Sequence, residues 1–429
     1  MTAEPGCGET AAPHIAMLSI HSSPLGPLGT RDTGGMSVYI RELCQWLGAH
    51  GHTVDIFTCA GTPPGEVSIA PNVRLVRLPV RFEMPIATTR LQSAVENVFE
   101  ALEAYRQQRG RTYDLIHSHY WISGVVGAMA QTLWHRPHIT MFHTLGAMKN
   151  RSCSAENESA DRIAHERWLA ATADHMVVPT QREMDNLLDV YQALPEKISV
   201  IPCGVNLDLF RPKDRQRSRN TLNVPADADL VLYVGRFAPL KGVERLLAAA
   251  ALLRPRWPRL QLMIVGGDGP ESPAYRDLVA HMDRLGINDM VRFPGRVAQR
   301  DLSVYYSAAD LLALPSHYES FGLVVLEALA CGTPVAATPV GVVENLLRPG
   351  VNGDIVRGSQ PADLAATISG ILGQPRRQAR TIRRIRQTVN DFDWPRVAAE
   401  LAAVYTPFLT APTASRIQQE TAPWGGLSN

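Results

Sequence analysis

The chain has 429 residues, of which 45% are hydrophobic and 19% are charged, and its formal net charge is +1. These values are typical of a globular protein of about two or three domains. A neutral total charge excludes the strong positive field that would draw the whole molecule to nucleic acid or to an acidic membrane.

Short apolar runs that end in Gly, Ser or His recur along the chain, and each is four to seven residues long. This is the length of a strand buried in a parallel sheet. Helical patterns, such as residues 37–50 and 243–253, lie between many of these runs. The alternation predicts an α/β protein whose parallel sheets are covered by helices on both faces. The predicted strands occupy residues 14–20, 53–58, 114–117, 138–142, 175–178, 230–234, 260–265, 290–293, 311–314 and 334–337.

The strand and helix pattern occurs twice, which predicts two Rossmann-like domains, residues 14–208 and 225–392, joined by a polar linker. Six arginines lie between Arg376 and Arg386, and a solvated helix face explains them better than a membrane or nucleic-acid patch. Residues 411–429 are rich in Ala, Thr, Pro, Gln and Gly, so we expect a disordered tail.

Cysteine usage and the N-terminal segment bear on the cellular compartment. The six cysteines show no CxxC spacing, so we expect reduced thiols rather than disulfides or zinc sites. Residues 1–13 lack the basic and apolar regions of a secretory signal. Residues 115–135 are uncharged, but their His, Trp, Gly and Ser content makes them a poor membrane span. The expected location is the cytoplasm.

Two glycines, Gly34 and Gly35, follow the first predicted strand and open the first predicted helix. Glycine lets a backbone approach a ligand closely, and the free amides of a helix N-terminus favour an anion. A tight turn without a ligand explains the same residues equally well. The spacing is not GxGxxG, so a dinucleotide-binding function has no support.

The segment from Val234 to Gly242 leaves the first strand of the second domain at its carboxyl end. Open α/β sheets bind ligands at this end of their strands. Arg236 and Lys241 are placed there to reach a diphosphate, and two fixed cations neutralise a leaving nucleotide as a magnesium ion would. The alternative is two surface charges that flank a turn.

The strongest candidate segment runs from Ser316 to Ala328. Glu319 lies in a loop after a strand, where it is placed to bind hydroxyls of a sugar. Ser320 is expected to cap a helix that contains Glu327, whose carboxylate is suited to a ribose diol. The amides offered to a phosphate belong to Phe321, Gly322 and Leu323.

His143 ends a predicted strand of the first domain, where it either lies over a reacting sugar or is structural. His117 and His119 have a spacing that metal ligands use, but no carboxylate or cysteine lies nearby in the sequence. We expect neither a metal nor a cofactor.

Together these segments resemble glycosyltransferase family 4, whose members have the GT-B fold. Glu319 and Glu327 are similar to the family's E-x7-E motif, and residues 234–242 are similar to its VGR-x4-KG motif. The resemblance implies two Rossmann-like domains that face a cleft, with a C-terminal helix at about residues 393–410 that crosses back to the first domain. It also implies retaining transfer of a sugar from a nucleotide diphosphate, with UDP the expected nucleotide.

The resemblance implies a role for each matching residue. The expected catalytic residues are His143, Arg236, Lys241 and Glu319. The expected donor-binding residues are Gly34, Gly35, Arg236, Lys241, Val297, Glu319, Phe321, Gly322, Leu323 and Glu327.

Within the family, the chain resembles the D-inositol-3-phosphate glycosyltransferases and, next, the sucrose-phosphate synthases. The similarity implies that Tyr120, Thr144 and Arg162 bind the phosphate of the acceptor. Ser37 is also expected to bind the acceptor, but it is a departure, because these relatives have an acceptor-contacting asparagine at this position. A second is that residues 74–90 offer no clear match to an expected phosphate-binding lysine. An alternative for Arg162 is a helix-surface pair with Glu158 or Glu166.

Other functions remain open at the level of sequence. A sugar-nucleotide epimerase would need no acceptor pocket, and a non-catalytic binding protein would not need all the motif residues. A glycoside hydrolase that uses both glutamates fits poorly if one of them holds ribose. Transfer to a fructose acceptor is a further alternative. The donor sugar, the acceptor and the choice between monomer and homodimer are left undecided.

Overall fold

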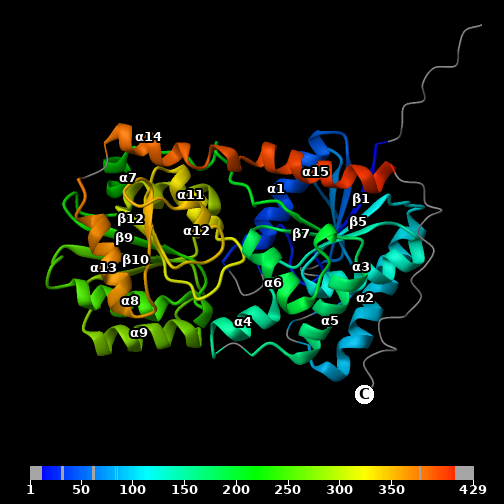
Figure 1. Cartoon of the computed structure of the whole chain (residues 1–429), viewed down its shortest axis with the longest axis horizontal. Coiled ribbons are helices and arrows are strands. Elements are labelled where there is room, and N and C mark those ends of the chain that lie inside the picture. Colours follow the sequence, from blue (N-terminus) through cyan, green and yellow to red (C-terminus); the bar gives the residue numbers. More distant parts are fainter. Residues whose placement is uncertain are drawn as a thin grey trace, which may run out of the picture.

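A computed structural model describes residues 12–29, 33–59, 63–82, 84, 86–155, 157–375 and 378–410. The chain forms two α/β domains that lie side by side, with the first domain on the right of Figure 1 and the second on the left. Each domain is a sheet with helices on both faces, so the predicted fold class is confirmed. In the part of the chain described, no helix is both long and apolar enough to span a membrane.

The first domain contains an eight-stranded sheet with the order β3-β4-β2-β1-β5-β6-β7-β8. Strand β3 is antiparallel to β4, and the other neighbours are parallel. The strands are β1 (His14–Leu18), β2 (Thr53–Thr58), β3 (Gly65–Ala70), β4 (Val73–Arg77), β5 (Leu115–His119), β6 (His138–Met141), β7 (His175–Val178) and β8 (Ile198–Val200). Its helices are α1 (Gly35–Ala49), α2 (Thr88–Gln108), α3 (Trp121–Trp134), α4 (Gly146–Ser152), α5 (Ala160–Thr172) and α6 (Gln181–Tyr191).

The second domain contains a six-stranded parallel sheet with the order β11-β10-β9-β12-β13-β14. The strands are β9 (Asp229–Val234), β10 (Leu260–Val265), β11 (Val291–Gly295), β12 (Leu311–Leu314), β13 (Val335–Ala337) and β14 (Gly353–Ile355). Its helices are α7 (Arg215–Thr221), α8 (Val243–Leu253), α9 (Pro273–Leu285), α10 (Leu302–Ala308), α11 (Leu323–Ala330), α12 (Val343–Leu346), α13 (Pro361–Leu372) and α14 (Ala379–Gln387).

Strand order places a switch point in each sheet. In the second sheet the order reverses between β9 and β12, and in the first sheet it reverses between β1 and β5. Ligands of open α/β sheets bind outside the carboxyl ends of the strands at such points. The two switch points therefore position one site between the domains.

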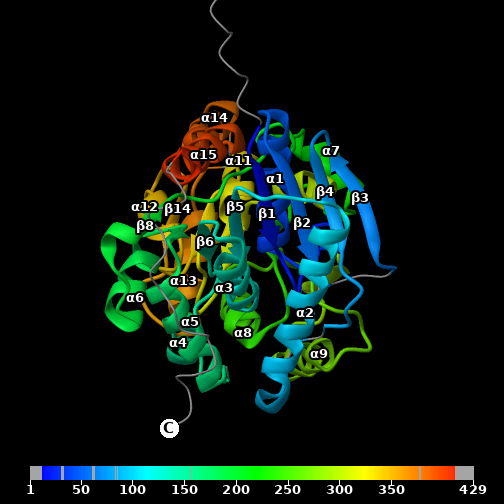
Figure 2. The ribbon, with the colours of Figure 1, turned by 90° about the vertical axis from the view of Figure 1, so that its right-hand side faces the viewer.

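Helix α15 (Trp394–Thr410) returns from the second domain and lies over the first, as expected for the crossing helix (Figures 1 and 2). The ring of Trp394 packs edge-on against Tyr39 of α1, and the hydroxyl of Tyr405 lies 2.6 Å from Nδ1 of His117 on β5. In α14, Arg380, Arg383 and Arg384 are exposed. Arg376 and Arg377 lie outside the described residues.

Candidate active site

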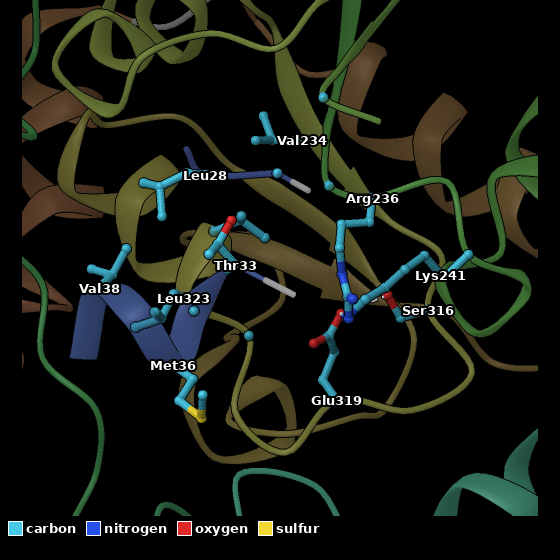
Figure 3. Close-up of a pocket in the computed structure, with 18 of the residues that line it drawn as sticks. Leu28, Thr33, Met36, Val38, Val234, Arg236, Lys241, Ser316, Glu319 and Leu323 are labelled. Atoms are coloured by element: carbon cyan, nitrogen blue, oxygen red, sulfur yellow. Dashed lines mark hydrogen bonds and ion pairs between the residues drawn. The ribbon is translucent and has the colours of Figure 1, made fainter. Parts of the chain in front are cut away.

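A cavity of about 760 Å³ lies between the two domains, at the carboxyl ends of both sheets. Figure 3 shows part of its wall, with side chains from α1 facing side chains from the second domain. Residues 33–36 from the first domain, and residues 234–241 and 318–324 from the second, all line it. The segments singled out in the sequence are thus brought to one place.

Lys241 and Glu319 form an ion pair on the second-domain wall. Lys241 Nζ lies 2.6 Å from Glu319 Oε1, and the Ser316 hydroxyl donates to the same oxygen over 2.8 Å. Arg236 points toward this pair (Figure 3). Gly242 follows with φ +65°, and a Cβ there would lie 2.3 Å from the carbonyl oxygen of Pro315, so only glycine fits the turn that aims Lys241.

Two helix N-termini meet at the cavity, one from each domain. Gly34 caps α1 and Gly322, with φ +96°, caps α11, and no side chain within the described ranges caps either helix. A Cβ on Gly35 would lie 3.3 Å from Leu323, which shows how closely the helices approach. The free amides of the first turn at each end, together with the helix dipoles, favour an anion here. The prediction that Ser320 caps this helix was wrong, because Gly322 is the cap and has the left-handed conformation that precedes α11.

Glu327 lies in the second turn of α11 and lines the cavity, although its side chain is largely buried. The Tyr306 hydroxyl donates to its Oε2 over 2.7 Å. Burial raises the pKa of Glu327 to about 7, against the lowering effect of the bond from Tyr306. The carboxyl group is thus held in place beside the helix terminus and is poised to change charge near neutral pH.

His143 lines the cavity from the first domain with a backbone φ of +60°. Tyr120, which also lines the cavity, has a φ of +76°. A positive φ is costly for residues other than glycine and tends to persist at functional sites. Burial lowers the pKa of His143 to about 3, so its imidazole is neutral at physiological pH.

The expected acceptor residues do not all reach the cavity. Tyr120 and Thr144 line it, whereas Arg162 is only 2% exposed and lies behind them. Arg162 Nη1 donates to the Tyr120 hydroxyl over 2.9 Å, and Nη2 donates to the Thr144 hydroxyl over 3.0 Å. Ser37 is fully buried, pairs with the Ser22 hydroxyl at 3.0 Å and is not part of the wall.

Arg162 forms ion pairs with both of the partners suggested from the sequence, and one of these partners is more deeply buried than the other. Arg162 Nε donates to Glu166 Oε1 over 2.7 Å, and Glu166 is fully buried. Arg162 Nη1 lies 2.9 Å from Glu158 Oε1, and Glu158 lines the cavity. Direct contact between Arg162 and an acceptor therefore stays a prediction.

Comparisons with known proteins assign the chain to a family. The model described as Glycosyltransferase Family 4 matches residues 33–209, and the model described as Glycosyl transferases group 1 matches residues 214–388. The D-inositol 3-phosphate glycosyltransferase of Thermobispora bispora is 38% identical over 411 residues, which cover 92% of this chain and 95% of that protein. The chain belongs to glycosyltransferase family 4.

Further relatives of this glycosyltransferase agree with the assignment. The D-inositol 3-phosphate glycosyltransferase of Geodermatophilus obscurus is 39% identical over 91% of this chain and 89% of its own. Among solved structures, the sucrose-phosphate synthase of Thermosynechococcus elongatus is similar with a TM-score of 0.85 and 33% identity, covering 93% of this chain and all of that one. Anabaena HepE, solved with UDP and glucose, shares the fold at 21% identity, with a TM-score of 0.72 over 92% of this chain and 99% of its own.

Several wall residues of this glycosyltransferase were not predicted from sequence. Lys149 and Glu158 line the first-domain side, although Glu158 was considered only as a partner of Arg162. Val297, expected at the donor site, does line the cavity. The sequence signal that could have identified such wall residues is a polar residue close to a recognised motif residue, as Lys149 is to Thr144. Further unpredicted wall residues are His21, Tyr39, Met84, Arg296 and Gln299.

The histidine pair with metal-ligand spacing is engaged in other contacts. His117 Nδ1 faces the Tyr405 hydroxyl, while His119 Nδ1 lies 2.9 Å from His143 Nε2. In the part of the glycosyltransferase that the structure describes, no group of three or more His, Cys, Asp or Glu side chains is arranged to hold a metal ion.

Proposed function

We propose that this glycosyltransferase moves a hexosyl or N-acetylhexosaminyl group from a UDP-sugar to a small phosphorylated polyol or sugar, with retention at the anomeric carbon. The observation that carries the proposal is that two helix N-termini, Arg236 and Lys241 all line the same cavity. Relatives named as D-inositol 3-phosphate glycosyltransferases support a phosphorylated acceptor. The solved complexes of HepE with UDP and with UDP-glucose support the donor.

In the proposed reaction, the diphosphate of the donor lies between the N-termini of α1 and α11. Their amides, Arg236 and Lys241 stabilise the negative charge that grows on the leaving UDP. These groups are fixed before the reaction, so little reorganisation is needed when the charge develops. Glu327 accepts hydrogen bonds from the ribose hydroxyls. Glu319, held by Lys241 and Ser316, accepts them from the transferred sugar.

The proposed acceptor lies against Tyr120 and Thr144, with its reacting hydroxyl on the face of the sugar from which UDP departs. The hydroxyl oxygen forms the new bond to the anomeric carbon while the bond to the UDP oxygen breaks. The departing phosphate oxygen takes the hydroxyl proton. His143 is neutral, so we assign it to hydrogen bonding with a sugar hydroxyl rather than to proton donation. Most of the rate enhancement then comes from positioning and charge stabilisation.

A panel of substrates tests this proposal. UDP-, ADP- and GDP-glucose and UDP-N-acetylglucosamine are each combined with inositol 3-phosphate, inositol, fructose 6-phosphate and fructose, and nucleotide release is measured. We expect release from a UDP-sugar only when a phosphorylated acceptor is present. Release that is the same with and without acceptor, or an epimerised donor in its absence, contradicts the proposal.

A further inference from the structure

Three charged side chains form a chain of ion pairs on the first-domain wall of the cavity. Glu158 Oε1 lies 2.9 Å from Arg162 Nη1 and also accepts a hydrogen bond from Lys149 Nζ. The side chains of Lys149 and Glu158 are 19% and 22% exposed, whereas Arg162 is 2% exposed. The carboxylate of Glu158 therefore stands at the cavity surface, between a lysine and an arginine.

Arg162 does not need Glu158 to neutralise its charge, because a second carboxylate does so from behind. Glu166 is fully buried and accepts from Arg162 Nε over 2.7 Å. It also accepts from the backbone N–H of Gly146 over 2.9 Å and from the Tyr191 hydroxyl over 2.6 Å. Glu166 is thus a permanent counter-ion, and Glu158 is an additional one on the cavity side.

The backbone of Glu158 is fixed while its side chain faces the cavity. Its N–H donates to Asn150 Oδ1 over 2.7 Å, and Asn150 Nδ2 donates to its carbonyl oxygen over 3.0 Å. Moving the carboxylate away from the two cations therefore needs only a side-chain rotation. Burial alone would raise the pKa of Glu158, but Arg162 and Lys149 outweigh it and hold the pKa below its usual value. The carboxylate is charged at neutral pH.

We propose that Glu158 is a displaceable counter-ion whose place between Lys149 and Arg162 is taken by the phosphate of the acceptor. This inference rests on the proposed function, in which the acceptor is phosphorylated. Carboxylates and phosphates are bound by the same cationic donors, and a phosphate carries more charge and more acceptor oxygens than a carboxylate. When the acceptor enters, its phosphate replaces the carboxylate and Glu158 rotates into solvent.

The exchange makes Glu158 a determinant of specificity. A phosphate restores the negative charge beside both cations after Glu158 has moved, whereas a neutral polyol would not replace the charge withdrawn from Lys149 and Arg162, which is costly. Neutral acceptors are thus rejected by the cost of separating the ion pairs. The same competition lowers affinity for phosphate, because every binding event must displace a negative charge that is already in place.

Substitution at Glu158 tests the exchange with inorganic phosphate as the probe. Calorimetry is performed on the full chain with saturating UDP, which occupies the other anion site at Arg236 and Lys241. Glu158→Gln keeps the shape of the side chain but removes its charge, so we expect phosphate to bind about tenfold more tightly than to wild type. Lys149→Gln should weaken binding by about tenfold. Glu100→Gln removes the same charge from an exposed position on α2 and should change nothing.

Unchanged or weaker phosphate binding by Glu158→Gln overturns the inference, provided that the melting temperature shows a folded protein. Kinetics separate this failure from failure of the proposed function. If wild type does not prefer a phosphorylated acceptor over its unphosphorylated form, the proposed acceptor class is wrong. If wild type has that preference but the KM of the phosphorylated acceptor is no lower in Glu158→Gln, only the role of Glu158 is wrong.

Discussion

His119 holds His143 from behind, with Nδ1 of the first ring 2.9 Å from Nε2 of the second. The other nitrogen of His119 faces the sulfur of Met17, which has no proton to give, so His119 Nε2 carries the hydrogen. Nδ1 of His119 then accepts from His143 Nε2–H. The result is a neutral His143 that keeps Nδ1 free of hydrogen, able to accept a bond from a sugar hydroxyl.

We therefore expect His119→Phe to lower kcat by about 10-fold to 100-fold, because His143 loses the partner that sets its orientation and tautomer. The dissociation constant for UDP should change little, since UDP does not depend on this ring. His119→Asn, which can still accept the hydrogen bond, should restore part of the rate. Normal kcat in the Phe variant, or an equal loss in both variants, argues against this positioning role.

Replacing either cation of the donor site should slow transfer strongly. Arg236→Ala and Lys241→Ala should each cost about 2–4 kcal/mol of transition-state stabilisation, the loss typical of one preorganised donor. The measurement is kcat/KM for the donor. Lys213→Ala, at an exposed position in the same half of the protein, serves as the control for lost charge. Near-normal kcat/KM in both site variants would remove the two cations from the mechanism.

Binding of UDP should depend on pH through Glu327. Its pKa is raised to about 7, so the carboxylate that accepts from ribose is lost as the pH falls through that value. We expect the dissociation constant of UDP to rise as the pH is lowered from 8 to 6. Glu327→Gln should bind UDP more weakly at pH 8 and show a flatter pH profile, whereas Glu319→Gln should impair transfer more than UDP binding. Equal loss of UDP affinity in the two variants contradicts this division of roles.

Activity should survive chelation. Arg236, Lys241 and the amides of α1 and α11 are proposed to supply the positive charge that a divalent ion supplies elsewhere. Transfer is measured after dialysis against EDTA, and then after Mg²⁺ or Mn²⁺ has been added. An enzyme that is inactive until the metal returns would show that the side chains and amides are not sufficient.

The parts of the fold that could be predicted from sequence are those with continuous apolar runs, such as residues 230–234 of β9 and the whole of β12. Strands β3, β4, β8 and β14 were not predicted. Strand β3 is an exposed edge strand, and β4 reads Val-Arg-Leu-Val-Arg, so neither shows an uninterrupted apolar run. The order of the strands comes from long-range pairing that local patterns do not encode.

In the site too, residues on local motifs could be predicted from sequence, whereas contacts between distant segments could not. Arg236, Lys241, Glu319 and Glu327 lie on segments that lead directly from strand to loop or helix, so their convergence could be predicted. The burial of Arg162 could not be predicted, because it depends on Glu166 and Tyr191, which pack behind it from two helices. Ser37 was expected at the acceptor, but its side chain is buried and its hydroxyl pairs with that of Ser22.

The most direct test of the proposed reaction is the NMR spectrum of the product. The purified protein is incubated with UDP-glucose or UDP-N-acetylglucosamine and with inositol 3-phosphate or inositol, and the anomeric protons are followed over time. We predict a new α-anomeric signal, which preserves the configuration of the donor, in the sample with the phosphorylated acceptor and not in its unphosphorylated counterpart. A β-linked product, or equal transfer to both acceptors, would contradict the account.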